Sequence, residues 1–136
     1  MNSSGSGEKT IAATPTEVLR VNNSSYKVIA IAVRNTGANA LTGFEVECRA
    51  YDWPDPEQDW ETVASASADY TDPPPKSTLL AGHNKLPGAP DPATLAAGTS
   101  TFLAISLEPY PYLRILATST NGTQLSYGYT LMGGGD

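Results

Sequence analysis

The sequence is poor in the side chains that most often build catalytic and metal sites. Among its 136 residues there is one cysteine, Cys48, and one histidine, His83. A single cysteine excludes an intrachain disulfide, and one histidine without a second metal ligand or a reactive cysteine nearby gives neither a zinc site nor a Cys–His nucleophilic pair. We therefore interpret Cys48 as a small buried hydrophobe and His83 as a loop residue that titrates with solvent.

Basic residues are also scarce, with 8 Lys and Arg against 14 Asp and Glu and a formal net charge of -6. Proteins that bind nucleic acid or an anionic membrane carry a basic face, so we expect neither partner. No apolar run approaches the length of a membrane span, and the first nine residues lack the basic and apolar segments of an export signal. These absences predict a soluble protein that is not exported by the general route.

What the sequence does have is repeated alternation of apolar and polar residues, the pattern of β-strands. We predict strands over residues 26–34, 44–51, 61–68, 101–107, 112–118 and 125–131, and a first strand or a single helical turn within Lys9–Val21. This number of short strands predicts an all-β fold, an immunoglobulin-like antiparallel β-sandwich with long Pro-rich loops, and a small β-barrel is the alternative. We place one β-sandwich domain at residues 10–132, between a flexible N-terminal tail at 1–9 and a flexible C-terminal tail at 133–136.

Two segments rich in Asn and Gly predict tight connections between strands. The bend NTGAN at residues 35–39 tolerates left-handed backbone, which favours a strand pair joined by a short loop. Asn121-Gly122 is flanked by β-branched residues and predicts a two-residue hairpin with a type I′ turn.

Two longer loops carry the candidate contact residues. Asp52–Trp60 is acidic and contains two prolines, and Thr71–Pro92 is rich in proline with little apolar pattern. Loops of this length in a compact domain are usually functional or disordered, and aromatic rings bury a large area at a small entropic cost. We therefore predict an interface, which includes a tight aromatic corner near residue 110, formed by Trp53, Trp60, Tyr70, Pro73, Pro74, Pro75, Tyr110 and Tyr112. Two alternatives stay open for the tryptophans, which either fold back over the edge of the sheet or stack on sugar rings.

Half of the acidic side chains lie close together in the sequence. Seven of the fourteen fall between Asp52 and Asp72, an interval without Lys or Arg. Their spacing does not match an EF-hand, so a solvated acidic loop is favoured over a calcium site. Carboxylates beside one Pro-rich loop are also not held across a cleft, as acid–base catalysis requires. We predict no catalytic residue, no metal and no cofactor, and a protein that is not an enzyme.

The C-terminal third carries a resemblance to a known group of proteins. The segment DPATLAAGTSTFL at Asp91–Leu103 is followed by YLRILATS at Tyr112–Ser119 and then by a Gly-containing turn. This succession resembles small β-sandwich virion proteins of tailed bacteriophages, and the LTGFEVE strand after the NTG corner is compatible with it. The resemblance implies a capsid decoration or cement protein on the head exterior, made in the host cytoplasm. It also implies binding to the major capsid protein and homo-oligomer formation on the capsid lattice.

Two other functions are kept as alternatives. One is a carbohydrate-binding or adhesive β-sandwich, including a tail or baseplate component, whose tryptophans and loop tyrosines would contact a surface glycan. The other is a hydrolase on a β scaffold, which would depend on acidic-loop residues such as Asp55 and Asp59.

Overall fold

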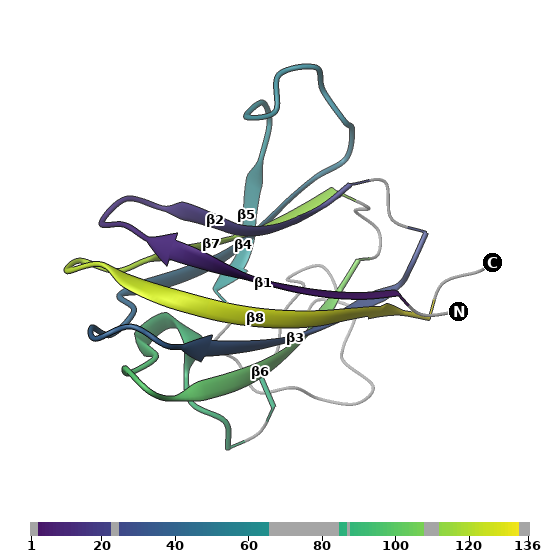
Figure 1. Ribbon diagram of the computed structural model, residues 1–136. Coiled ribbons are helices and arrows are strands. Elements are labelled where there is room, and N and C mark those ends of the chain that lie inside the picture. The colour runs from purple at the N-terminus through teal and green to yellow at the C-terminus, as the bar shows by residue number, and fades with distance from the viewer. Residues whose placement is uncertain (1–2, 23–24, 66–84, 87, 108–111, 134–136) are drawn as a thin grey trace.

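The protein is a sandwich of two antiparallel β-sheets. The computed structural model describes residues 3–22, 25–65, 85–86, 88–107 and 112–133. The first sheet has the strand order β1-β8-β3-β6 and the second has the order β2-β7-β4-β5 (Figure 1). The strands are β1 (Ser3–Ile11), β2 (Thr16–Val21), β3 (Val28–Asn35), β4 (Gly43–Arg49), β5 (Glu61–Ser65), β6 (Ser100–Ser106), β7 (Tyr112–Thr118) and β8 (Thr123–Met132), with a 3-10 turn η1 (Pro92–Thr94) before β6.

The alternating residues of the strands meet between the two sheets. Ile29, Ile31 and Val33 of β3 are fully buried, and Phe44 and Val46 of β4 lie on the facing sheet in the same core. Burying such a side chain contributes about 1.5–3 kcal/mol, so this alternation is enough to fix which face of each strand points inward. The β-sandwich prediction is therefore confirmed, and the barrel alternative is wrong because the described strands form two separate sheets.

The flexible tail predicted at residues 1–9 is wrong for the part that the structure describes. Residues 3–11 form β1, which pairs with β8 along its whole length. The strand gave no periodic signal because its inward positions Gly5 and Gly7 are glycines. A Cβ on Gly5 would lie 2.6 Å from the hydroxyl of Tyr129, and one on Gly7 would lie 2.7 Å from that of Tyr127. The glycines make room for the two tyrosine rings, which supply the apolar surface that β1 lacks.

The segment that follows is also extended. Residues 16–21 form β2, so the alternative of a helical turn at this point is wrong. The strand pairs with β7 and buries Val18 and Leu19 in the core, and this tertiary packing outweighs the local signal of a proline at a first helical position.

The bend after β3 connects the two sheets and does not join a pair of hydrogen-bonded strands. β3 pairs with β6 and β8, whereas β4 pairs with β5 and β7. Asn35 at the end of β3 is fully buried, and its Nδ2 donates to the carbonyls of Asn39 (2.8 Å) and Leu95 (3.0 Å). Its Oδ1 accepts from the backbone N–H of Gly37 (3.1 Å) and the hydroxyl of Thr123 (2.7 Å). The amide side chain therefore links β3, the bend, the segment after η1 and the start of β8.

The Asn121-Gly122 turn likewise crosses between sheets, so the predicted two-residue hairpin is wrong. β7 lies in the second sheet and β8 in the first, and the two strands are not neighbours. Gly122 has a φ of 78°, but Asn121 does not have the positive φ that a type I′ turn requires. The Nδ2 of Asn39 donates to the carbonyls of both residues, so the two inter-sheet bends are joined at this end of the sandwich.

Cys48 is buried in β4, in agreement with the sequence interpretation. Burial, reinforced by the nearby charges of Glu61 and Glu47, raises the pKa of the thiol from 9.0 to about 11. Because the thiolate is the reactive form, a shift of this size lowers its fraction about a hundredfold at neutral pH. We expect Cys48 to react slowly with a disulfide reagent at pH 7.5 and at the ordinary rate of a free thiol after unfolding in guanidinium. Equal labelling rates in the two states would contradict the buried position.

Candidate interaction surface

Arginines from three strands meet on the outer face of the second sheet. Arg20 of β2, Arg114 of β7 and Arg49 of β4 all lie on the solvent side of their strands, and Arg20 is directly opposite Arg114 in the strand register. The loop at residues 50–60, between β4 and β5, projects from the sandwich (Figure 1) and covers this group through its last residue, Trp60. The guanidinium carbons lie 5.1 Å (Arg20), 4.5 Å (Arg49) and 4.6 Å (Arg114) from the centroid of the Trp60 ring. Contacts of this kind contribute about 0.5–2 kcal/mol each, depending on how far the cation is shielded from water.

Carboxylates balance these like charges. Arg114 Nε donates to Glu47 at 2.6 Å, and its Nη1 donates to Glu57 at 2.7 Å. Arg20 Nε donates to Glu17 at 2.9 Å, and its second ion pair reaches Glu57 at 3.5 Å. The hydrogen bond from Arg114 holds the pKa of Glu57 below its usual 4.5, and the charges of Arg114 and Arg20 act in the same direction. Glu57 therefore stays charged under mildly acidic conditions and keeps the loop attached to the sheet.

Arg49 is buried under the 50–60 loop and forms hydrogen bonds with its backbone. Only 2% of its side chain is exposed, and its guanidinium donates to the carbonyls of Asp55 (3.1 Å) and Gln58 (3.2 Å) and to the carboxylate of Asp52 (3.1 Å). The indole N–H of Trp60 donates to the carbonyl of Pro56 at 2.7 Å, which closes the loop on itself. Among the residues that the structure describes, the buried Nε of Arg49 has no hydrogen-bond partner. The expectation of a solvated acidic loop is therefore wrong for part of the loop, because the adjacent Arg49 and the distant Arg20 and Arg114 supply cations to it.

The structure separates the two tryptophans. Trp60 folds back over the sheet, whereas Trp53 remains 36% exposed and packs edge-on against Tyr51, with ring centroids 4.9 Å apart and planes at 71°. Tyr51 itself is 59% exposed. Asp52, between the two rings, is tied to Arg49, so the aromatic pair stands on a braced backbone.

The other predicted interface residues are placed as follows. Tyr112 begins β7 and is partly exposed, and it lies opposite Arg49, the last residue of β4 before the loop that carries the aromatic pair. Tyr70, Pro73, Pro74, Pro75, Tyr110 and His83 lie outside the described residues.

Sequence reasoning missed the three arginines because Arg49 and Arg114 looked like ordinary outward strand positions and Arg20 lay in a segment left open between a strand and a helical turn. A partial signal was present. Arg49 and Arg114 stand at polar positions of alternating strands, and a tryptophan ends the loop that follows the first of them.

Two negative findings concern the described part of the chain alone. It contains no group of three or more His, Cys, Asp or Glu side chains placed to hold a metal ion. Within the same residues, no helix has the length and apolar character needed to cross a bilayer.

Comparisons with known proteins give a fold but no family. No protein-family model matches this chain, and no curated protein matches it. The crystal structure of the SPBc2 prophage-derived protein YomS is similar to it with a TM-score of 0.54 and 7% sequence identity, over 96% of this chain and 95% of that one. A structure of Bacillus endospore appendages, described as a novel family of disulfide-linked pili, aligns with a TM-score of 0.41 and 11% identity over 97% and 87% of the two chains. At 7% identity, the likeness to YomS shows that the two proteins share a fold.

Proposed function

We propose that this chain is a non-enzymatic structural protein of a tailed-phage virion, which decorates the head exterior by binding the major capsid protein. The observation that carries the proposal of a binding role is the exposed Tyr51–Trp53 pair on a loop that Arg49 braces. A braced aromatic pair loses little conformational entropy on binding, and Trp and Tyr are enriched among the residues that dominate interface energies. Tyr112, opposite Arg49 at the base of this loop, would widen the contact.

The assignment to a virion is supported by two independent similarities. One is the sequence resemblance of residues 91–119 to phage virion proteins, and the other is the fold shared with a prophage-derived protein over almost the full length of both chains. The proposed decoration role places the protein on the capsid exterior after synthesis in the host cytoplasm.

The test is co-sedimentation of the purified protein with phage heads assembled without it. We expect saturable binding, and we expect the double substitution Tyr51→Ala and Trp53→Ala to weaken it by about thirtyfold, the effect of losing about 2 kcal/mol at an interface centre. The matched control is the double substitution Tyr51→Phe and Trp53→Phe, which keeps an aromatic ring at both positions and should retain most of the affinity. Absence of saturable binding to heads would contradict the decoration role.

The same aromatic pair favours a second candidate, a carbohydrate-binding or adhesive module of the tail or baseplate. Exposed Tyr and Trp rings also stack on the apolar faces of sugars. Glycan-coated beads run beside the heads separate the two functions. Retention on one glycan that Tyr51→Ala and Trp53→Ala abolish, with no binding to heads, would replace the first proposal with the second.

A further inference from the structure

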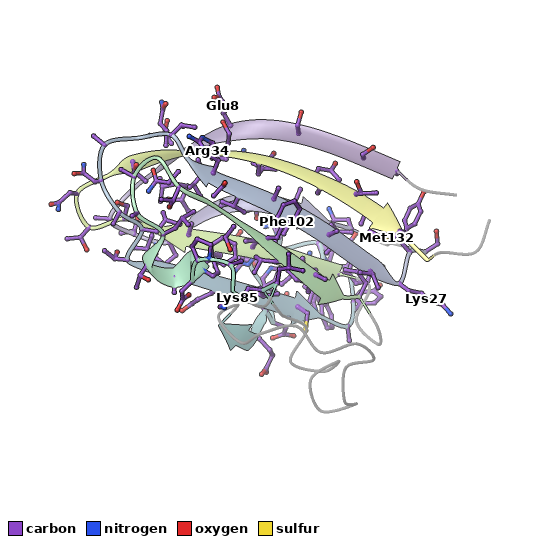
Figure 2. The ribbon with its side chains drawn as sticks, turned by 90° about the horizontal axis from the view of Figure 1, so that it is seen from below. Glu8, Lys27, Arg34, Lys85, Phe102 and Met132 are labelled. Atoms are coloured by element: carbon purple, nitrogen blue, oxygen red, sulfur yellow. The ribbon has the colours of Figure 1, made fainter. Side chains whose placement is uncertain are left out.

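The outer face of the first sheet carries a protruding side chain beside a shallow hollow. Neither takes part in the aromatic interface described above. Strand register places its outward residues in rows across the four strands. From one end of the sheet to the other, these rows are Glu8–Ser126–Arg34–Ser100, Ser6–Gly128–Ala32–Phe102, Ser4–Thr130–Ala30–Ala104 and Met132–Val28. Figure 2 shows Phe102 between Arg34 and Met132 along these strands.

One large side chain stands beside a shallow depression on this face. Phe102 on the edge strand β6 is 54% exposed, and its neighbours across the sheet are Ala32 and Gly128. A hollow of about 350 Å³ extends from β1 to β3 with Phe102 at its side, and its other lining residues are Gly5, Ala30, Ala32, Gly128, Tyr129 and Thr130. A protruding ring and a hollow on the same face are the two halves of a self-complementary contact, which is the requirement of a two-fold dimer.

The charges on this face are also complementary to those of a second copy of the same face. Glu8 of β1 and Arg34 of β3 lie in one row on either side of Ser126 of β8. Glu8 accepts a hydrogen bond from Ser126 at 3.1 Å, and none of the described side chains forms an ion pair with Arg34. A chain with a net charge of -6 repels its own copies over most of its surface. On this face, by contrast, Arg34 and Glu8 lie in one row, so a second copy can pair its opposite charges with them.

A two-fold axis parallel to the strands makes both features match. It reverses the strand order across the contact, so β6 of one protomer faces β1 of its partner, and β3 faces β8. Phe102 then lies over the small residues Ser6 and Gly128 of the second protomer. Arg34 lies over Ser126 and next to Glu8, and each contact occurs twice.

We propose that this chain forms a two-fold dimer through the outer faces of its β1-β8-β3-β6 sheets, with Phe102 of each protomer at the β1–β8 side of the hollow of the other. The proposal concerns a different sheet from the aromatic pair and does not rest on a role in a virion.

Sedimentation velocity of the full chain over a concentration series measures the dimer. We expect a monomer–dimer equilibrium, and we expect Phe102→Ser and Ala32→Arg each to weaken it at least tenfold. The first substitution removes the protruding ring and the second fills the hollow. Glu45→Arg, a charge reversal at an exposed position of the other sheet, is the matched control and should leave the equilibrium unchanged. A chain that stays monomeric at hundreds of micromolar, or a dimer that Phe102→Ser does not weaken, would overturn the proposal.

A charge exchange tests the axis itself. Arg34→Glu and Glu8→Arg each create two repulsive contacts in a homodimer, so each variant alone should associate at least tenfold more weakly. In an equimolar mixture of the two variants both contacts become attractive, so a heterodimer of nearly unaltered affinity is expected. Thermal unfolding of each variant checks that it is folded. Failure of the mixture to dimerise would exclude this axis.

Discussion

Replacing Asn35 with alanine is expected to lower the free energy of unfolding by about 3–4 kcal/mol, because a buried polar group that loses its partner costs about 1–3 kcal/mol. The side chain makes four hydrogen bonds, to Gly37, Asn39, Leu95 and Thr123, and none of its surface is exposed. Some of these partners have a second hydrogen bond, since the carbonyl of Leu95 also accepts from Leu41 and the N–H of Gly37 also reaches Gln124. The hydroxyl of Thr123 and the carbonyl of Asn39 therefore carry most of the loss.

Chemical and thermal denaturation measure this effect. A drop of about 3–4 kcal/mol corresponds to a fall of about 10–20 °C in Tm for a domain of this size. Asn22→Ala is the control, because Asn22 is exposed and lies in no strand, and it should change the stability by less than about 0.5 kcal/mol. A loss below about 1 kcal/mol for Asn35→Ala would show that other contacts hold the 35–39 bend against the start of β8.

The contact between the 35–39 bend and the start of β8 can also be tested sterically. Gly37 lies so close to β8 that a Cβ would be 2.0 Å from the hydroxyl of Thr123 and 2.5 Å from the backbone nitrogen of Gln124. Gly37→Ala should therefore displace the bend even though it removes no hydrogen-bonding group. If Asn35→Ala and Gly37→Ala act on one joint, their effects will be less than additive in the double variant.

Replacing Arg114 with methionine is expected to lower the stability by about 3 kcal/mol and to loosen the 50–60 loop, because breaking a nearly buried ion pair leaves its charge poorly compensated. The side chains of Arg114 and Glu47 are only 11% and 13% exposed, and the bond between them is 2.6 Å long. Arg114 also holds Glu57 and contacts the face of Trp60. Methionine preserves much of the apolar contact with the ring, so the measured loss reports mainly on the charge.

A double-mutant cycle separates the ion pair from the rest. With Glu47→Gln in the background, Arg114→Met should cost less, with a coupling energy of about 1–3 kcal/mol. Lys9→Met, at an exposed position of β1, is the control for loss of one positive charge. Additive effects of the two substitutions would contradict the pairing.

The pH dependence of Trp60 fluorescence, followed in a Trp53→Phe background, gives an independent readout. The pKa of Glu57 is lowered in the folded protein, so the attachment that its charge provides is present above the ordinary pKa and is lost as the pH falls through the lowered one. In Arg114→Met the shorter ion pair of Glu57 is absent and its pKa returns toward the usual value, so the fluorescence transition should become smaller and the part that remains, through Arg20, should move to higher pH. An unchanged transition would show that Glu57 does not control the loop.

The sequence predicted where most of the strands lie but not the order in which they pair. Alternation located β3, β4, β6 and β7 closely because one face of each is buried, and a shift by one residue would expose every apolar side chain. Alternation says nothing about pairing, however. The bends at 35–39 and 119–122 have the composition of hairpins, but they cross between sheets, because backbone partners for β3 and β8 come from distant strands.

The sequence by itself determined that this protein is all-β, that its inward residues form one core, and that Cys48 lies within it, because burial of apolar surface has a periodicity that can be read along the chain. Only the tertiary structure decided that β1 exists, since its Ser and Gly residues are ordered by the backbone of β8 and the rings of Tyr127 and Tyr129. The tertiary structure also decided which tryptophan packs on the sheet and which remains exposed. Trp60 is held by arginines that lie 40 residues before it and 54 residues after it, in addition to the nearby Arg49, and no local pattern reports such contacts.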